Sequence, residues 1–207
     1  YITVAIKTNG TMWAWGNNDY GNLGQNDKIY RSSPVQIPGT TWKQFSGGIF
    51  KACYAIKTDG TLWSWGYNPI GALGHNNKTQ YSSPKQVGSD TTWSTVSQSY
   101  YQTALATKTD GTLWAWGMNY FGILGQNEVS PGNSYSSPVQ IPGTNWGTTI
   151  NDIAGTDYGN FARKTDGTIW AWGGNDKGQL GQNEGPGSLP SGSYSSPVQI
   201  PGTWDGI

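Results

Sequence analysis

KTDGTLWSWG, residues 57–66, is the stretch that decides the fold, and the chain carries four versions of it with small changes. The other copies are KTNGTMWAWG at 7–16, KTDGTLWAWG at 108–117 and KTDGTIWAWG at 164–173. An Asn-Gly or Asp-Gly pair between two apolar runs rich in β-favouring residues is the strongest short-range signal for a β-hairpin. The sequence therefore predicts a repeated hairpin, and a repeat of this kind decides the architecture before any single motif does.

A two-residue type I′ turn at residues 59–60 would also fix the register of the hairpin. It predicts Ile56 opposite Trp63 and Ala55 opposite Ser64. Because side chains alternate between the faces of a strand, each sheet would then have one bulky face and one small face. Such sheets pack well against copies of themselves, with the bulky face of one filling the hollow face of the next. We accordingly expect four indoles to be largely buried between sheets: Trp63, Trp65, Trp114 and Trp116.

Three further motifs follow each hairpin in a constant order: Gly-x-Leu-Gly, Ser-Ser-Pro, and a short apolar run that ends before another Trp. The first Lys of the hairpin recurs at intervals of 50, 51 and 56 residues. Each unit reads as four short strands, which in the second unit lie at about 42–46, 52–58, 61–66 and 84–87. We refer to these four strands as a, b, c and d. Four-stranded units repeating at about this interval are typical of β-propeller blades.

The series KTDGTLWAWG, N-x-x-G-x-LG, SSPVQIPG and Trp resembles the RCC1 (regulator of chromosome condensation) repeat, and its near-identical copies look like bacterial and phage members of that family. The resemblance covers essentially the whole chain. It implies an all-β fold, a β-propeller of four-stranded antiparallel blades, most often seven. The family's Gly-x-x-His-x-x-Ala pattern before strand b lacks its His here, as in SQSYYQTALA.

The predicted units are 1–41, 42–92, 93–145 and 146–207. Four repeats either close on themselves or form part of a longer ring. We expect a fragment of a longer chain, because the sequence starts at Tyr1 and enters the repeat at its strand b.

Composition argues against several classes of function. The 207 residues include 12 basic and 12 acidic side chains, with no run of either sign, so no footprint for nucleic acid is visible. No apolar stretch is long enough to insert in a membrane. Cys53 and His75 are the single representatives of their types, which argues against a metal site or a Cys-His or Ser-His pair. We predict no enzyme, cofactor or metal.

The connections between strands a and b and between c and d emerge on one face, and this face carries the variation. The third and fourth units have insertions at 128–133 and 184–192. A scaffold that repeats except in the loops of one face is suited to binding, although unconstrained drift of those loops would leave the same pattern. The predicted partner-binding residues are Phe50, Tyr100, Tyr101, Phe121, Glu128, Val129, Tyr158, Glu184 and Leu189.

Two classes of function follow. The first is a non-enzymatic binding or structural module that mediates protein–protein contacts in a virion, cell-surface or extracellular assembly. The second is a regulator of an enzyme, either a guanine-nucleotide exchange factor or an inhibitor that caps an active site. The lack of a basic patch disfavours a chromatin-bound nuclear role. The 12 Trp could suggest the light-sensing members of the family, but hairpins and first strands account for all of them.

Overall fold

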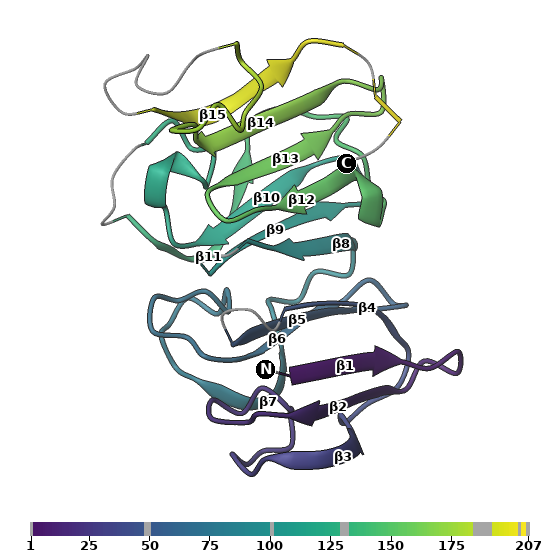
Figure 1. Cartoon of the computed structure of the whole chain (residues 1–207). Helices are drawn as coiled ribbons and strands as arrows, with labels where there is room; N and C mark the ends of the chain where they lie inside the picture. Colours follow the sequence, from purple (N-terminus) through teal and green to yellow (C-terminus); the bar gives the residue numbers. More distant parts are fainter. Residues whose placement is uncertain are drawn as a thin grey trace.

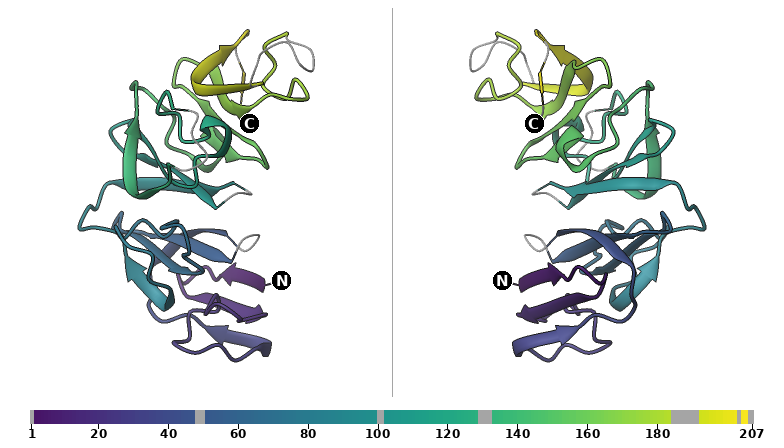
Figure 2. Two further views of the ribbon diagram at one scale, coloured as in Figure 1. Left: turned by 90° about the vertical axis from the view of Figure 1, so that its left-hand side faces the viewer. Right: turned by 90° about the vertical axis from the view of Figure 1, so that its right-hand side faces the viewer.

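The computed structural model describes residues 2–47, 51–99, 102–128, 133–183, 192–202 and 204–205. They form four antiparallel sheets, here called blades 1 to 4, which follow one another along an arc (Figures 1 and 2). The predicted all-β propeller architecture is confirmed. Blade 1 has three strands in the described part of the chain, and the other blades have four each.

The strands of blades 1 and 2 are β1 (Ile2–Ile6), β2 (Met12–Gly16), β3 (Arg31–Gln36), β4 (Trp42–Gly47), β5 (Ala52–Lys57), β6 (Leu62–Gly66) and β7 (Tyr81–Gln86). Those of blades 3 and 4 are β8 (Trp93–Gln98), β9 (Thr103–Lys108), β10 (Leu113–Gly117), β11 (Tyr135–Ile141), β12 (Ile153–Gly155), β13 (Gly159–Arg163), β14 (Ile169–Gly174) and β15 (Ser193–Ile200). Two 3₁₀ turns are the only helical elements of the described residues, η1 (Tyr120–Gly122) and η2 (Ile150–Asp152).

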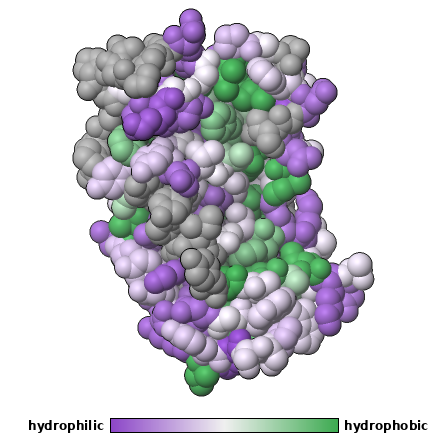
Figure 3. Space-filling view, viewed as in Figure 1, coloured by the Kyte–Doolittle hydropathy of each residue, from purple (hydrophilic) through white to green (hydrophobic). Residues whose placement is uncertain are grey.

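Strand order in each sheet follows the order of the chain, so successive connections alternate between the two ends of the strands. The a–b and c–d loops lie on the left in Figure 1 and form the loop face. The b–c and d–a turns lie on the right and form the turn face. Strands β4, β8 and β12 contact one another in series and line the inside of the arc. On that side apolar surface gathers in the middle, between hydrophilic margins (Figure 3).

The hairpin loop has three residues, 58–60, so the predicted type I′ turn is wrong. Lys57 N–H donates to the Thr61 carbonyl over 3.1 Å, and Gly60 N–H donates to the Lys57 carbonyl over 3.0 Å. Only Gly60 in this loop has positive φ, at 77°. This is the geometry of a turn followed by a left-handed glycine bulge. The Asp59 carboxylate accepts hydrogen bonds from both the backbone N–H and the hydroxyl of Thr61, over 3.0 and 2.7 Å.

The extra loop residue shifts the register and changes which side chains share a face. Ile56 lies opposite Leu62, and Ala55 lies opposite Trp63. The predicted division into one bulky and one small face is therefore wrong. Each blade instead has an aliphatic face, which includes Ile56 and Leu62, and an indole face, which includes Ala55 and Trp63.

The aliphatic face of each blade packs on the indole face of the next, and three such cores are formed. Between blades 2 and 3, Tyr54, Ile56 and Leu62 meet Trp93 and Trp116, all of them buried. The second indole of each hairpin is fully buried in blades 2 to 4, as expected for Trp65 and Trp116. The first indole is only partly buried and packs at the margin of the core, so Trp63 and Trp114 are less buried than expected.

The half-buried indoles have a different role, because each covers the ammonium group of the hairpin Lys. Lys57 Nζ lies 4.1 Å from the centre of the Trp63 ring and 4.8 Å from that of Trp42, the first residue of strand a. Trp63 Nε1 donates to the Thr61 hydroxyl over 2.8 Å. The same Lys between two indoles recurs in blades 3 and 4, which explains the constant Lys of the repeat.

Replacing Trp116 with Ala is expected to lower the free energy of unfolding by about 3–5 kcal/mol, since the side chain fills a closed inter-blade core. Replacing the half-buried Trp114 with Ala should cost less, about 1–2 kcal/mol. Urea unfolding followed by circular dichroism measures both. Equal losses in the two variants would contradict this assignment of the faces.

Candidate binding surface

An exposed aromatic patch lies on the loop face where blades 3 and 4 meet. Phe121 belongs to η1 in the c–d loop of blade 3, and Tyr158 belongs to the a–b loop of blade 4. Their ring centres are 5.6 Å apart in an edge-to-face arrangement, and the Tyr120 ring lies 5.9 Å from that of Phe121. The three residues are 37–40% exposed. The structure thus brings together two predicted residues and adds Tyr120, which the sequence analysis did not name.

Backbone constraints hold this aromatic patch in place. Phe121 has φ of 58°, an uncommon left-handed conformation for an aromatic residue. The next residue, Gly122, lies so close to Ser195 of blade 4 that an added Cβ would stand 2.5 Å from its Cα. Gly174 provides the base of the patch: a Cβ there would lie 3.3 Å from Tyr158 Cβ and 3.5 Å from Phe121 Cγ. The rings therefore rest on closely packed backbone, with no room for a side chain at Gly122 and little room at Gly174.

A hollow of about 460 Å³ adjoins the aromatic patch in blade 4. Its charged residues are Asp157, Asp176 and Lys177, and its other lining residues are Thr156, Tyr158 and Gln179. Gln179 Nε2 donates to the Asp176 carboxylate over 3.1 Å and is the main cause of the lowered pKa of that group. Asp176 is therefore ionised near neutral pH. The surface combines aromatic area with fixed acceptors, a composition common at protein interfaces.

A second aromatic pair occupies the matching position between blades 1 and 2. The Tyr20 and Tyr67 rings are 4.3 Å apart, and Lys51 Nζ lies 4.2 Å from the centre of the Tyr20 ring. Tyr20 and Phe121 hold the same place in the repeat, directly before the first Gly of Gly-x-Leu-Gly. Sequence reasoning missed this pair, although the aromatic residue at one repeat position in two units was a usable signal.

The other predicted binding residues divide into two groups. Glu128 is exposed, and its carboxylate accepts hydrogen bonds from Asn133 Nδ2 and the Tyr135 hydroxyl, each over 3.2 Å. It therefore stabilises its own loop. The remaining six lie outside the described residues: Phe50, Tyr100, Tyr101, Val129, Glu184 and Leu189.

His75 and Ser64 form a pair that resembles catalytic chemistry but has another role. His75 Nε2 lies 3.0 Å from Ser64 Oγ. The Ser64 hydroxyl donates to the Leu73 carbonyl over 2.6 Å, so its proton is already used and the imidazole must donate to it. Burial is the largest cause that lowers the pKa of His75, to about 4. In blade 1 the same place is held by Gln25, whose Nε2 donates to the backbone carbonyls of Leu23 and Gln36 instead of to a side chain.

Within the described part of the chain, no group of three or more His, Cys, Asp or Glu side chains could hold a metal ion. None of its helical elements is long and apolar enough to span a membrane. Cys53 is fully buried, and burial raises the pKa of its thiol. A buried thiol of this kind behaves as a small hydrophobic side chain.

The blades and their loop face define a β-propeller that carries variable loops on a repeated scaffold. A family model described as the regulator of chromosome condensation (RCC1) repeat matches residues 9–50, 59–106, 110–162 and 166–204. The chain belongs to the RCC1 repeat family. A second model of the same description matches residues 150–179.

Known relatives are similar over most of this chain. The ultraviolet-B receptor UVR8 of Arabidopsis thaliana is 29% identical over 186 residues, which are 88% of this chain and 41% of UVR8. Human WBSCR16 matches with a TM-score of 0.78 and 21% identity, over 98% of this chain and 52% of that one. A chain in the structure of Kap60 bound to yeast RCC1 (Prp20) matches with a TM-score of 0.79 and 19% identity. The match covers 98% of this chain and 48% of that one. This chain thus spans about half the length of its relatives or less.

A substitution at His75 tests its structural role. A His with a lowered pKa in the folded state binds its proton more readily when unfolded. The protein should therefore lose stability as the pH falls from 6.5 toward about 4. His75→Gln, which installs the residue of the other units, should make the urea midpoint less sensitive to pH in this range. An unchanged pH dependence would show that His75 titrates normally.

Proposed function

We propose that this protein is a non-enzymatic module that binds a protein partner through its loop face, with the aromatic patch of Tyr120, Phe121 and Tyr158 at the centre of the interface. The single observation behind the proposal is the patch itself. Two loops that are distant in sequence place three exposed rings together against closely packed backbone. Aromatic side chains bury a large area on binding and lose few rotamers, so they are common anchors of interfaces.

The hollow beside the patch supports this choice of face. Asp157 and Asp176 supply acceptors next to the rings, and Lys177 supplies a donor. A partner segment could place an apolar or aromatic side chain against Phe121 and Tyr158 and hydrogen-bond to the neighbouring carboxylates. The turn face, in contrast, consists mainly of tight hairpin turns and short d–a turns, of which that of blade 2 is one residue longer than those of blades 1 and 3.

We infer an extracellular, cell-surface or virion setting rather than a nuclear one. The formal net charge of zero and the absence of a run of basic residues in the sequence support this inference. Proteins that act on chromatin generally present a basic patch to the phosphate backbone.

Regulation of an enzyme is the second candidate, and similarity to solved structures favours it. One matched structure is that of Prp20p of Saccharomyces cerevisiae, described together with its binding properties to Gsp1p and histones; its TM-score is 0.71 at 18% identity. Under this reading the aromatic patch would contact the regulated enzyme. Guanine-nucleotide exchange and active-site capping are the two forms that the role could take.

Site-specific crosslinking tests the proposed face. A photoreactive phenylalanine analogue at Tyr158 should capture a partner, whereas the same analogue at Ile150, which is 57% exposed in η2 on the turn face, should not. With the captured partner purified, the double variant Phe121→Ala and Tyr158→Ala should weaken binding by about 30-fold or more, or roughly 2 kcal/mol.

Ile150→Ala is the matched control and should leave the affinity unchanged. Capture at Ile150 alone, or an affinity that the double variant does not alter, would contradict the proposed face. If the partner is a GTPase, faster release of bound fluorescent GDP would assign the regulatory alternative.

A further inference from the structure

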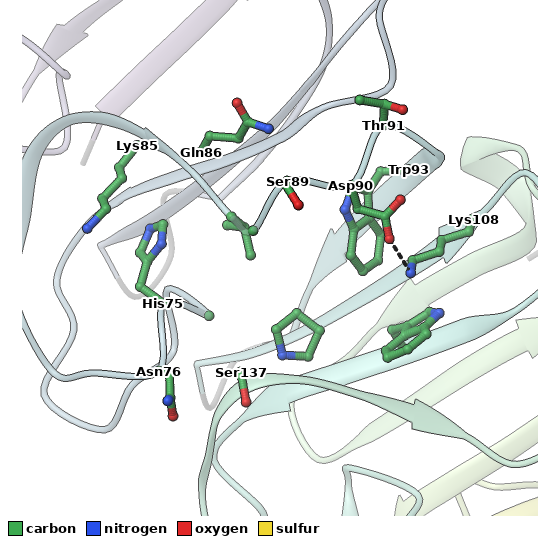
Figure 4. Close-up of a pocket in the computed structure, with 15 residues that line it drawn as sticks. His75, Asn76, Lys85, Gln86, Ser89, Asp90, Thr91, Trp93, Lys108 and Ser137 are labelled. Atoms are coloured by element: carbon green, nitrogen blue, oxygen red, sulfur yellow. Dashed lines mark ion pairs between the residues drawn. The ribbon is translucent and has the colours of Figure 1, made fainter.

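A cavity of about 930 Å³ opens between blades 2 and 3, away from the aromatic patch. Its walls come from both blades: His75 and Val87 belong to blade 2, and Trp93 and Ser137 belong to blade 3. Figure 4 shows His75 on one side and Asp90, Trp93 and Lys108 on the other. The volume lies within the range of small-molecule sites.

The d–a turn of blade 2 explains why a cavity forms at this junction. The turns after blades 1 and 3 read Ile-Pro-Gly-Thr, and Gly39 packs against the indole that begins the next blade, with its Cβ position 3.4 Å from Trp42. Gly143 does the same at 3.5 Å from Trp146. The turn of blade 2 reads Val-Gly-Ser-Asp and is one residue longer. A Cβ on its Gly88 would meet nothing within 4 Å.

The longer turn also adds an acidic group that the turns after blades 1 and 3 lack. Asp90 pairs with Lys108 over 2.5 Å, and its side chain remains 38% exposed. Lys108 Nζ is itself held 4.1 Å from the Trp114 ring and 4.8 Å from the Trp93 ring. The wall of the cavity therefore presents a fixed carboxylate beside a fixed ammonium group.

The remaining lining selects for a ligand that is neutral and rich in hydroxyl groups. The apolar contact surface comes mainly from the partly exposed Trp114 and Pro138, because Val87 and Trp93 are only 3–4% exposed and contribute little more than an edge. Five uncharged polar side chains surround this surface: Asn76, Gln86, Ser89, Thr91 and Ser137. A hydrocarbon ligand seated over these groups would displace their water without replacing its hydrogen bonds, which is costly.

The charges of the lining nearly cancel, which disfavours a highly charged ligand. Asp90 and Lys108 neutralise each other, and burial keeps His75 neutral near pH 7, with a pKa of about 4. Lys85 Nζ donates to the Tyr81 hydroxyl over 2.8 Å, and in Figure 4 its ammonium group lies beyond His75 from the centre of the cavity. A nucleotide would require several free cations.

We propose that this cavity binds a neutral sugar residue of a short glycan. The ring hydroxyls would donate to the Asp90 carboxylate and to side-chain amide oxygens, and would accept from Lys108 and the hydroxyl groups. The carbon face of the ring would pack against Pro138 and the indoles. The ligand thus matches both the paired charges and the apolar surface.

Calorimetry with the whole chain tests the proposal with four neutral probes: maltotriose, cellotriose, galactotriose and triacetylchitotriose. At least one should bind, and trigalacturonic acid should bind at least ten-fold more weakly than galactotriose. If none of the neutral probes binds at 10 mM, or if the acidic probe binds as well as galactotriose, the proposal is overturned.

Substitutions in and away from the cavity test whether the sugar binds there. Asp90→Ala should raise the dissociation constant at least ten-fold, whereas Asp157→Ala, an exposed acid on the loop face, should leave it unchanged. Replacing residues 87–92, VGSDTT, with the IPGTT of blade 1 should close the cavity and abolish binding. Because blade 1 folds with that turn, the blade should remain intact, as circular dichroism and the urea midpoint can verify.

Ser137→Tyr provides a second way to fill the cavity if the turn replacement unfolds the chain. Sugar binding that survives in all of these cavity variants would overturn the assignment. The Phe121→Ala and Tyr158→Ala double variant should bind the sugar normally, so this proposal and the proposed protein partner can fail separately.

Discussion

The structure depends on the close approach between the c–d loop of one blade and the next blade. A Cβ on Gly21 would lie 2.4 Å from Ser82, and one on Gly71 would lie 2.4 Å from Ser136, so only glycine fits. Beside each contact a backbone N–H crosses the junction, as from Asn26 to the Ser82 carbonyl over 2.8 Å. Blades in this contact cannot separate without exposing an entire core, because a single sheet has no other surface on which to bury its apolar faces.

The buried indoles reinforce the same junction. Trp65 Nε1 donates to the Asn22 carbonyl and Trp172 Nε1 to the Ile123 carbonyl, each over 2.8 Å and each across two blades. At the middle junction the corresponding carbonyl, that of Ala72, accepts instead from the Tyr54 hydroxyl over 2.6 Å. The loop that carries Gly-x-Leu-Gly is therefore a packing element of the next blade, and only its flanking residues are free to vary.

This arrangement separates scaffold from function. Side chains in the repeated positions fill cores or hold turns, so their identity is set by packing. Departures from the repeat alter the surface without disturbing the cores. Phe121 and Tyr158 depart from it on the loop face, and the longer turn at Gly88 departs from it between blades 2 and 3. The two proposed binding sites stand at these departures.

The sequence by itself determined the repeated four-stranded unit, the propeller and its membership in the RCC1 repeat family. Local signals suffice for these features, since Asp-Gly, Ser-Ser-Pro and the recurring glycines act on the backbone nearby. It did not determine the register of the hairpin. The Asp59 carboxylate accepts hydrogen bonds from the N–H and the hydroxyl of Thr61, and these bonds favour a three-residue loop over a two-residue one.

Only the tertiary structure decided the pairing of surfaces. Phe121 and Tyr158 belong to different blades, and their contact depends on how far η1 reaches over the glycines of blade 4. The cavity likewise depends on the distance between one turn and an indole of the next blade. Both are set by the packing of whole sheets, a long-range effect that spacing within a single unit does not encode.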